Sequence, residues 1–270
     1  MGNALIIFTP RSGSTIAAEL LAYKYKSINL DELVTGQLRG VIRDRLPPDV
    51  KELVLQSEIL NEDIKIPDDN LSNTYKLFHK RFDTIKQIQK KHPVVLKYFP
   101  TFSTPGVGII EWATLNNFEI YFVTRRSAEE QLYSYLLANS KESFYKSAKR
   151  AGRLKIYEYA GFLNVKNAPR VVFPPVTITE ERALNLILTL CGINNTWTAY
   201  YNKFKDYGKV VYYEDGIVRG DFSEFGINSE LYKDYSLEPK SLQPTYEYSI
   251  GDQISNWNDM LEIFKQYNTA

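Results

Sequence analysis

The stretch Thr-Pro-Arg-Ser-Gly-Ser-Thr at 9–15 has the residue types and the position of an anion-binding loop. It follows a continuous apolar run at 4–8 and precedes a helical pattern at 14–26. A strand that turns sharply into a helix directs several backbone N–H groups to one point, at the positive end of the helix dipole. This order of segments predicts a loop that holds a phosphate-like group.

Five residues of this loop are the predicted ligands of the anion, and each residue type has its own reason. The glycine allows the anion to approach the backbone closely. The hydroxyl groups add short donors, and the arginine adds a permanent positive charge in a planar fork that suits oxyanions. The predicted binding residues are Arg11, Ser12, Gly13, Ser14 and Thr15. The competing interpretation is a polar turn that only joins the strand to the helix.

The loop lacks the Gly-Lys-Ser/Thr ending found in nucleoside triphosphatases. In those proteins the lysine reaches the β- and γ-phosphates, and the hydroxyl group holds Mg²⁺. Without this ending the loop has no evident holder for a metal-bound triphosphate. The missing ending therefore favours a different phosphate-like group.

A second candidate anion site lies in the segment Glu-Ile-Tyr-Phe-Val-Thr-Arg-Arg-Ser that begins at 119. Arg126 ends a predicted strand, and Ser134 lies eight residues further on, two turns into the following helix. An arginine and a serine in this arrangement can converge on one phosphate group. The competing interpretation is that Arg125 and Arg126 are solvated charges and Ser134 is an ordinary helix residue.

Together the two segments resemble the sulfotransferases that use 3′-phosphoadenosine 5′-phosphosulfate (PAPS), including the bacterial members that act on trehalose. The 9–15 loop is similar to their 5′-phosphosulfate loop, with Arg11 where many members have lysine and many bacterial members have arginine. Arg126 and Ser134 match the pair that clamps the 3′-phosphate in this family. The resemblance implies that PAPS is the co-substrate.

The activity implied by the resemblance is transfer of a sulfuryl group to a hydroxyl of a carbohydrate or another small acceptor. Such a transfer needs a base for the hydroxyl proton and cations for the charge on the departing phosphate oxygen. Arg11 is the predicted catalytic cation. Lys97, in the segment Leu-Lys-Tyr-Phe-Pro at 96–100, either steadies the sulfuryl oxygens or caps a strand end.

The base is predicted to be a carboxylate. Many eukaryotic cytosolic members use a histidine near this lysine, and the segment 96–100 has none. In trehalose-type members a glutamate about this far after the loop is the base, and Glu32 stands nineteen residues after Gly13. Asp31 and Glu58 are the next candidates. The competing interpretation is that all three are solvated charges.

Two other functions stay open at the level of the sequence. One is a P-loop-type kinase of a small molecule or nucleotide, with a variant phosphate loop that binds ATP and Mg²⁺. The other is a non-catalytic protein that binds PAPS or its product, 3′,5′-adenosine bisphosphate (PAP). The missing lysine argues against the kinase, and the missing histidine leaves the non-catalytic protein open.

The elements that must position these residues follow from the hydrophobic pattern. Short apolar runs predict buried strands at 4–8, 94–98, 119–124 and 209–213. The helical segments between them imply crossover connections and a mostly parallel sheet. We therefore expect an α/β fold with a P-loop-like central parallel sheet flanked by helices.

Helical patterns account for most of the remaining chain. The segment 35–92 is predicted to be a helical cover that ends in an amphipathic helix at 75–91. Further helices are predicted at 128–150, 180–190, 196–206 and 256–267. The sequence has no repeats and no convincing linker, so we expect one domain spanning 1–270.

Composition narrows the possible partners. A formal net charge of +1 argues against a general affinity for nucleic acid. The single cysteine and the two histidines argue against a disulfide framework and against a metal site built from these residues. The chain enters a strand almost at once, and no apolar run is long enough to cross a bilayer. We therefore expect a cytoplasmic protein with no membrane span and no metal.

Overall fold

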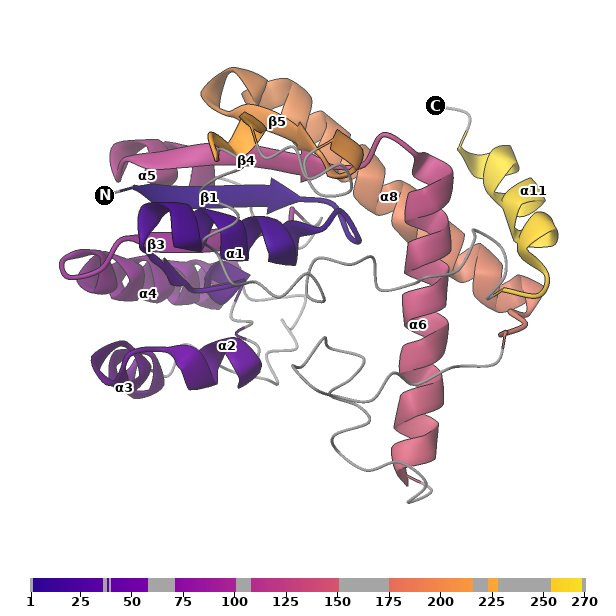
Figure 1. The fold of residues 1–270 in the computed structure, drawn as a ribbon, viewed down its shortest axis with the longest axis horizontal. Coiled ribbons are helices and arrows are strands. Elements are labelled where there is room, and N and C mark those ends of the chain that lie inside the picture. The colour runs from indigo at the N-terminus through magenta and orange to yellow at the C-terminus, as the bar shows by residue number, and fades with distance from the viewer. Residues whose placement is uncertain are drawn as a thin grey trace. The chain divides into compact units, whose positions relative to one another are not determined.

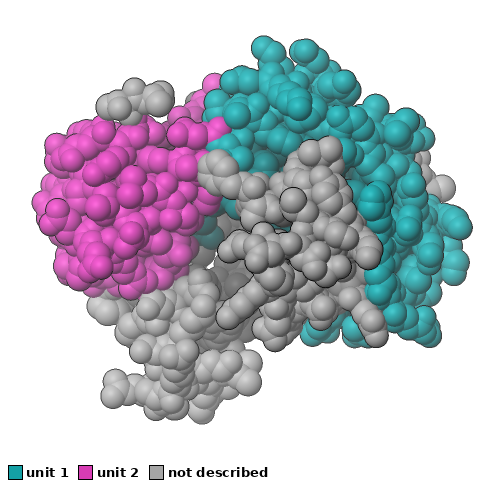
Figure 2. All heavy atoms as spheres, turned by 180° about the vertical axis from the view of Figure 1, so that it is seen from behind, with its two compact units in different colours: residues 1–124, 196–235 teal, residues 125–195, 236–270 magenta. Residues whose placement is uncertain are grey.

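The structure is a computed structural model, and it describes most of the chain in two compact units, which Figure 2 colours separately. The described residues are 2–35, 38, 40–57, 71–100, 108–150, 175–215, 223–227 and 254–268. Unit 1 comprises residues 1–124 and 196–235, and unit 2 comprises residues 125–195 and 236–270. The expectation of one domain spanning 1–270 stays a prediction.

Unit 1 is built on a five-stranded sheet in which all neighbouring strands are parallel (Figure 1). The strands are β1 (Asn3–Phe8), β2 (Ile28–Asn29), β3 (Val94–Tyr98), β4 (Phe118–Thr124) and β5 (Lys209–Tyr212). Their order in the sheet is β2-β3-β1-β4-β5. The expected α/β fold with a parallel central sheet flanked by helices is confirmed, and all four predicted strands are present.

The sequence did not predict β2, the strand at one edge of the sheet. It has two residues, and its Ile28 and Asn29 pair with Val94 and Val95 of β3. Two residues are too few to show the alternation by which a strand is detected in a sequence. Strand β2 places residues 30–32, which follow it, at the carboxyl edge of the sheet beside β3.

The strand order creates a switch point between β1 and β4. The chain leaves β1 toward the β3 side of the sheet, because β2 and β3 follow, and it leaves β4 toward β5. Connections that depart in opposite directions leave a crevice at the carboxyl ends of the two strands, where ligands of open α/β sheets commonly bind. The 9–15 loop follows β1 and therefore begins at this point.

Helices account for most of the remaining described residues. They are α1 (Ser14–Tyr25), α2 (Gly40–Arg45), α3 (Pro48–Gln56), α4 (Leu71–Gln89), α5 (Ile109–Leu115), α6 (Ala128–Arg150), α8 (Glu180–Phe204) and α11 (Trp257–Tyr267), with short 3₁₀ turns η1 (Leu33–Thr35), η2 (Lys205–Tyr207) and η4 (Ser223–Phe225). The described part of the predicted cover at 35–92 is largely helical. No described helix combines the length and the apolarity required to cross a bilayer.

One helix prediction was wrong. The sequence suggested separate helices at 180–190 and 196–206, and the structure has the single helix α8. Gly192 and the two asparagines after it are weak helix formers, each less favourable than alanine by up to about 1 kcal/mol. Buried apolar residues on both sides, such as Ile187 and Trp197, hold α8 in hydrophobic clusters and outweigh that preference.

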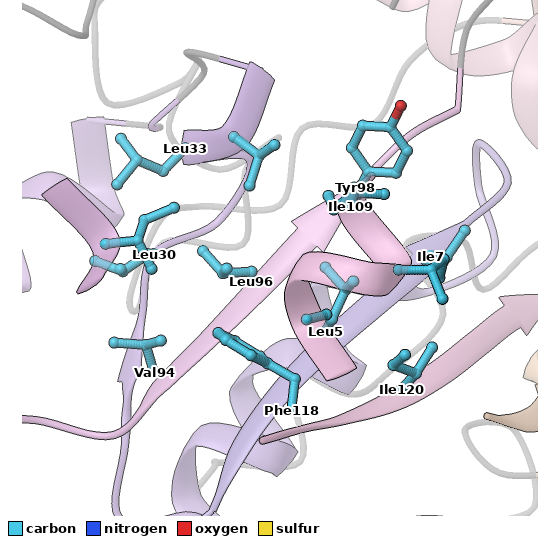
Figure 3. Close-up of a cluster of buried hydrophobic side chains, with 14 of the residues drawn as sticks. Leu5, Ile7, Leu30, Leu33, Val94, Leu96, Tyr98, Ile109, Phe118 and Ile120 are labelled. Carbon is cyan, nitrogen blue, oxygen red and sulfur yellow. The ribbon is translucent and has the colours of Figure 1, made fainter. Parts of the chain in front are cut away.

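The main core of unit 1 lies on one face of the sheet. Leu5 and Ile7 of β1 point to this face and pack with Leu96 and Tyr98 of β3 (Figure 3). Buried residues of α4, α5 and the C-terminal part of α8 complete the cluster. Because strand side chains alternate, Ile6, Phe8 and Lys97 belong to the opposite face. Helix α1 packs on β1 and β3.

Unit 2 has its own apolar core. It joins buried residues of α6, the N-terminal part of α8 and α11, among them Leu136, Ile187 and Phe264. Asn256, just before α11, receives a hydrogen bond from the Ile178 N–H group (3.1 Å) and donates one to the Ile178 carbonyl (2.7 Å). This double contact ties the start of α11 to the segment that precedes α8.

The packing of β3 can be tested with two matched leucines. Leu96 is fully buried in the sheet, whereas Leu115 at the end of α5 is 83% exposed. We expect Leu96→Ala to lower the free energy of unfolding by about 2–5 kcal/mol, because it leaves a cavity in the core. Leu115→Ala should change it by less than about 0.5 kcal/mol. Urea unfolding curves measure both values, and equal effects would contradict the described core.

Candidate functional site

A compact turn connects β1 to α1. The Ser12 hydroxyl donates a hydrogen bond to the Thr9 carbonyl (2.7 Å), and the Ser12 N–H group donates to the same oxygen (3.3 Å). The hydroxyls of Thr9 and Thr124 are 3.3 Å apart, which joins the carboxyl ends of β1 and β4. The single hydroxyl proton of the fully buried Ser12 thus serves the turn, and its predicted contact with an anion stays a prediction.

Two residues of this loop have left-handed backbone conformations. The φ angle is 61° at Arg11 and 75° at Gly13. Glycine adopts this conformation without steric cost, whereas an L-residue such as arginine loses roughly 1–2 kcal/mol. Strained backbone of this kind clusters at functional sites. Gly13 is therefore required by the turn itself, in addition to its predicted role of admitting an anion.

The first turn of α1 offers backbone donors. The helix begins at Ser14 with Gly13 as its N-cap, and its first internal hydrogen bond runs from Ala17 N–H to Gly13 O (3.0 Å). The N–H groups of Ser14, Thr15 and Ile16 precede that bond, so they have no partner inside the helix. The N-cap residue, Gly13, has no side chain that could cap this end. Unsatisfied N–H groups at a helix start are suited to an anion.

Helix α6 shows what a capped start looks like in the same chain. Its N-terminal Glu130 N–H group donates to the Ser127 hydroxyl (3.2 Å), and the Gln131 N–H group donates to the Ser127 carbonyl (3.0 Å). A serine followed three residues later by glutamate is a helix-capping pattern. The start of α1 has glycine in the N-cap position, which supplies no side-chain acceptor for these N–H groups.

At the carboxyl end of β3, Lys97 pairs with two consecutive acids. Its Nζ atom lies 2.8 Å from Asp31 Oδ1 and 3.2 Å from Glu32 Oε1. The side chains of Lys97 and Asp31 are 3% and 1% exposed, whereas that of Glu32 is 21% exposed. A buried ammonium requires such pairing, because an isolated buried charge costs several kcal/mol. The sequence suggested neither pairing.

The turn that carries the two acids is fixed by Asn29, the last residue of β2. Its side-chain oxygen accepts a hydrogen bond from the Asp31 N–H group (2.9 Å), and its amide donates to Glu19 of α1 (3.0 Å). The Lys97 N–H group donates to the Asp31 carbonyl (2.7 Å). Asp31 has a left-handed φ of 50°. These contacts direct one acid into the interior and leave the next at the surface.

A buried arginine holds the following residues. Arg81 of α4 donates to the Val34 carbonyl of η1 (3.0 Å), and burial lowers the pKa of Arg81 to about 10. The guanidinium therefore stays charged at neutral pH. The turn with Asp31 and Glu32 is thus held from α1 and β3, and η1, which follows it, is held from α4. Asn29 and Arg81 were not among the predicted site residues. The contact of Arg81 is distant in sequence. The side chain of Asn29, in contrast, contacts Asp31 and Glu19, which are two and ten residues away.

The acid turn lies close to the anion loop within unit 1. Lys97 Nζ is 5.0 Å from the centre of the Phe8 ring, and Phe8 is the last residue before the loop. Lys97 and Ile6 occupy paired positions in β3 and β1. Glu32 and Lys97 therefore lie at the edge of the sheet where β1 ends and the loop begins.

The structure distinguishes two of the three candidate bases by their exposure. Asp31 is buried and paired with Lys97, so its carboxylate has little access to a substrate hydroxyl. Glu32 is the partly exposed acid of this turn. Glu58 lies outside the described residues. Of the two described candidates, Glu32 is the one whose side chain is partly exposed.

The predicted 3′-phosphate residues belong to unit 2. Arg126 follows the end of β4 by two residues and is exposed, whereas Ser134 lies on α6 and is buried. Arg125, the neighbour of Arg126, is 3.8 Å from Glu130. The convergence of Arg126 and Ser134 on one phosphate stays a prediction.

The left-handed backbone at Gly13 gives a direct test of the loop geometry. We expect Gly13→Ala to lower the free energy of unfolding by about 1–2 kcal/mol, because alanine is strained at this φ. Gly13→Asn should be milder, since asparagine tolerates the left-handed region better than other L-residues. Urea unfolding of the three proteins measures the difference. Gly13→Ala as stable as the parent would rule out this backbone conformation.

Comparison with protein-family models, with curated proteins and with solved structures found no match. The chemical interpretation of this site therefore depends on its own residues. The observations that carry it are the donor-rich start of α1 and the partly exposed Glu32 beside Lys97.

Proposed function

We propose that this protein is a PAPS-dependent sulfotransferase with a P-loop-like fold that transfers the sulfuryl group to a hydroxyl of a carbohydrate or another small acceptor. The observation that carries the proposal is the 9–15 loop, which joins β1 to the uncapped start of α1 at the switch point of a parallel sheet. Arg11 and the N–H groups of Ser14 and Thr15 are assigned to the 5′-phosphosulfate end of PAPS.

The loop chemistry favours a phosphosulfate over a metal-bound triphosphate. A triphosphate loop ends in a lysine and a hydroxyl residue that organise the terminal phosphates and Mg²⁺. Here the loop carries Arg11 but no lysine. The lysine that lies nearby, Lys97, is buried and paired with Asp31 and Glu32. Backbone donors and Arg11 suffice for a phosphosulfate without a metal.

In the proposed reaction the acceptor hydroxyl oxygen forms a bond to sulfur as the bond from sulfur to the phosphate oxygen breaks. That oxygen leaves with the electron pair as part of PAP, and the hydroxyl proton passes to the carboxylate of Glu32. Arg11 and the α1 donors stabilise the charge that develops on the leaving oxygen. Positioning and electrostatics supply most of the catalysis, as in phosphoryl transfer.

Arg126 and Ser134 are assigned to the 3′-phosphate of the same nucleotide. This assignment comes from their spacing of eight residues and from the resemblance to the sulfotransferase family. PAP carries a 3′-phosphate that AMP lacks, so the difference between the responses to PAP and to AMP reports on this phosphate.

Thermal unfolding with added nucleotide tests the proposed ligand. With EDTA present and PAP at 100 times its Kd, we expect about 2.7 kcal/mol of stabilisation, or roughly 5–10 °C in Tm. Arg11→Ala and Arg126→Ala should each weaken PAP binding roughly 10–100-fold, the loss of one charged hydrogen bond. Arg45→Ala, exposed on α2, is the control and should leave binding unchanged.

The titration distinguishes a sulfotransferase from a kinase. Stabilisation by PAP without a divalent metal supports the phosphosulfate site. Stabilisation by ATP with Mg²⁺, together with no response to PAP, would refute the sulfotransferase proposal and favour a kinase with a variant loop.

The role of Glu32 is tested by removing its charge. We expect Glu32→Gln to bind PAP within about twofold of the parent and to lose about 10²–10⁴-fold in the rate of sulfuryl transfer from [³⁵S]PAPS, the usual contribution of a general base. Glu52→Gln, exposed within α3, is the matched control. Full transfer activity in Glu32→Gln would show that another group accepts the proton.

A further inference from the structure

The most unusual charged group in the described part of unit 1 is the ammonium of Lys97. It lies in β3 with its side chain 3% exposed, on a strand whose other residues are all buried and mostly apolar. A buried charge is tolerated only when close partners compensate it. The two acids that do so are consecutive, and they differ sharply in exposure.

The nearer partner is the one that no substrate can reach. Asp31 Oδ1 is 2.8 Å from Lys97 Nζ with a side chain that is 1% exposed. Asp31 also accepts the Lys97 backbone N–H at its carbonyl (2.7 Å). Two bonds between the same pair of residues fix the lysine side chain relative to the acid turn. Asp31 therefore determines where the ammonium lies.

The ammonium in turn constrains Glu32. Lys97 Nζ is 3.2 Å from Glu32 Oε1 and donates a hydrogen bond to it. An ammonium has three N–H groups and can serve both acids at once. With Oε1 engaged, the other carboxylate oxygen of Glu32 is the one left to accept a proton. The lysine thus orients the carboxylate, and Asp31 holds the lysine.

The backbone conformation of Asp31 is consistent with these separate roles of Asp31 and Glu32. Asp31 has a left-handed φ of 50°, which costs an aspartate roughly 1–2 kcal/mol unless its surroundings compensate. The compensation comes from Asn29, whose side chain accepts the Asp31 N–H and is itself bonded to Glu19 of α1. Both adjacent acids thus reach Lys97 Nζ, Asp31 from the interior and Glu32 with a partly exposed side chain.

We propose that Asp31 is a positioning residue for sulfuryl transfer: it anchors the ammonium of Lys97, which holds Glu32 Oε1 so that Oε2 receives the proton of the acceptor. Lys97 acts in the same chain of contacts and does not touch the sulfuryl group. This inference rests on the proposed function, in which Glu32 is the base.

The test measures release of [³⁵S]sulfate from [³⁵S]PAPS with water as the acceptor. We expect Asp31→Asn to lower kcat about 10–100-fold, because misplacement of a base by about 1 Å has an effect of that size. The KM for PAPS and the Kd for PAP should stay within about twofold of the parent values. Asp49→Asn, an exposed acid that pairs with His92, is the matched control.

Non-additivity separates positioning from a general structural effect. If Asp31 acts only through Glu32, then adding Asp31→Asn to Glu32→Gln should lower kcat no further. A purely structural role predicts the same factor in both backgrounds. Multiplicative losses in kcat would therefore overturn the proposal.

Asp31→Asn is at risk of poor folding because it leaves the Lys97 charge without its nearest partner, so a second variant is needed. The double variant Asp31→Asn with Lys97→Met removes both buried charges, so its stability should recover. We expect its kcat to stay low, because Glu32 has lost the group that orients it. Recovery of the parent kcat together with stability would overturn the proposal.

The outcomes also distinguish this inference from the proposed function. A parent protein that fails to bind PAP overturns sulfuryl transfer and the role of Asp31 with it. A parent that binds PAP and releases sulfate, with Asp31→Asn unchanged in kcat, overturns the role of Asp31 alone.

Discussion

The candidate site depends on the need to compensate one buried charge, the ammonium of Lys97 in β3. An unpaired charge at this position would cost several kcal/mol, so β3 requires acids at its carboxyl end. They come from the turn after β2, where Asp31 and Glu32 both reach Lys97. The pairing of β2 with β3 and the left-handed backbone of Asp31 bring both acids to this position. One carboxylate is enclosed, and the next lies partly exposed at the edge of the sheet.

The same edge carries groups of opposite character a short distance away. The loop after β1 ends in the uncapped start of α1, where backbone N–H groups and Arg11 favour an anion. Phe8 links the two regions, since it precedes the loop and its ring lies 5.0 Å from Lys97 Nζ. Sulfuryl transfer needs donors for the leaving phosphate and an acceptor for the proton of the incoming hydroxyl. The proposed function assigns these two needs to the α1 start and to Glu32.

Local sequence patterns predicted most strands and helices, whereas contacts between residues distant in sequence determine the geometry of the acid turn. The strands and the 9–15 loop were predictable because each depends on residues close together in the chain. Strand β2 was missed because two residues have no periodicity. The Asp31–Lys97 pair joins positions 66 residues apart through strand pairing, which no local pattern encodes. The role of Arg81 was missed for the same reason. The role of Asn29 depends on a contact only two residues away, which its residue type could have suggested. Ser12 was identified from its type, but its hydroxyl proton serves the turn.

The central claim is that the start of α1 holds the phosphate from which the sulfuryl group departs. A crystal structure of the protein with PAP, grown without divalent metal, tests this most directly. The 5′-phosphate is predicted to accept hydrogen bonds from the N–H groups of Ser14 and Thr15, with Arg11 on the same phosphate. A fully occupied PAP whose 5′-phosphate lies away from the 9–15 loop would contradict the claim.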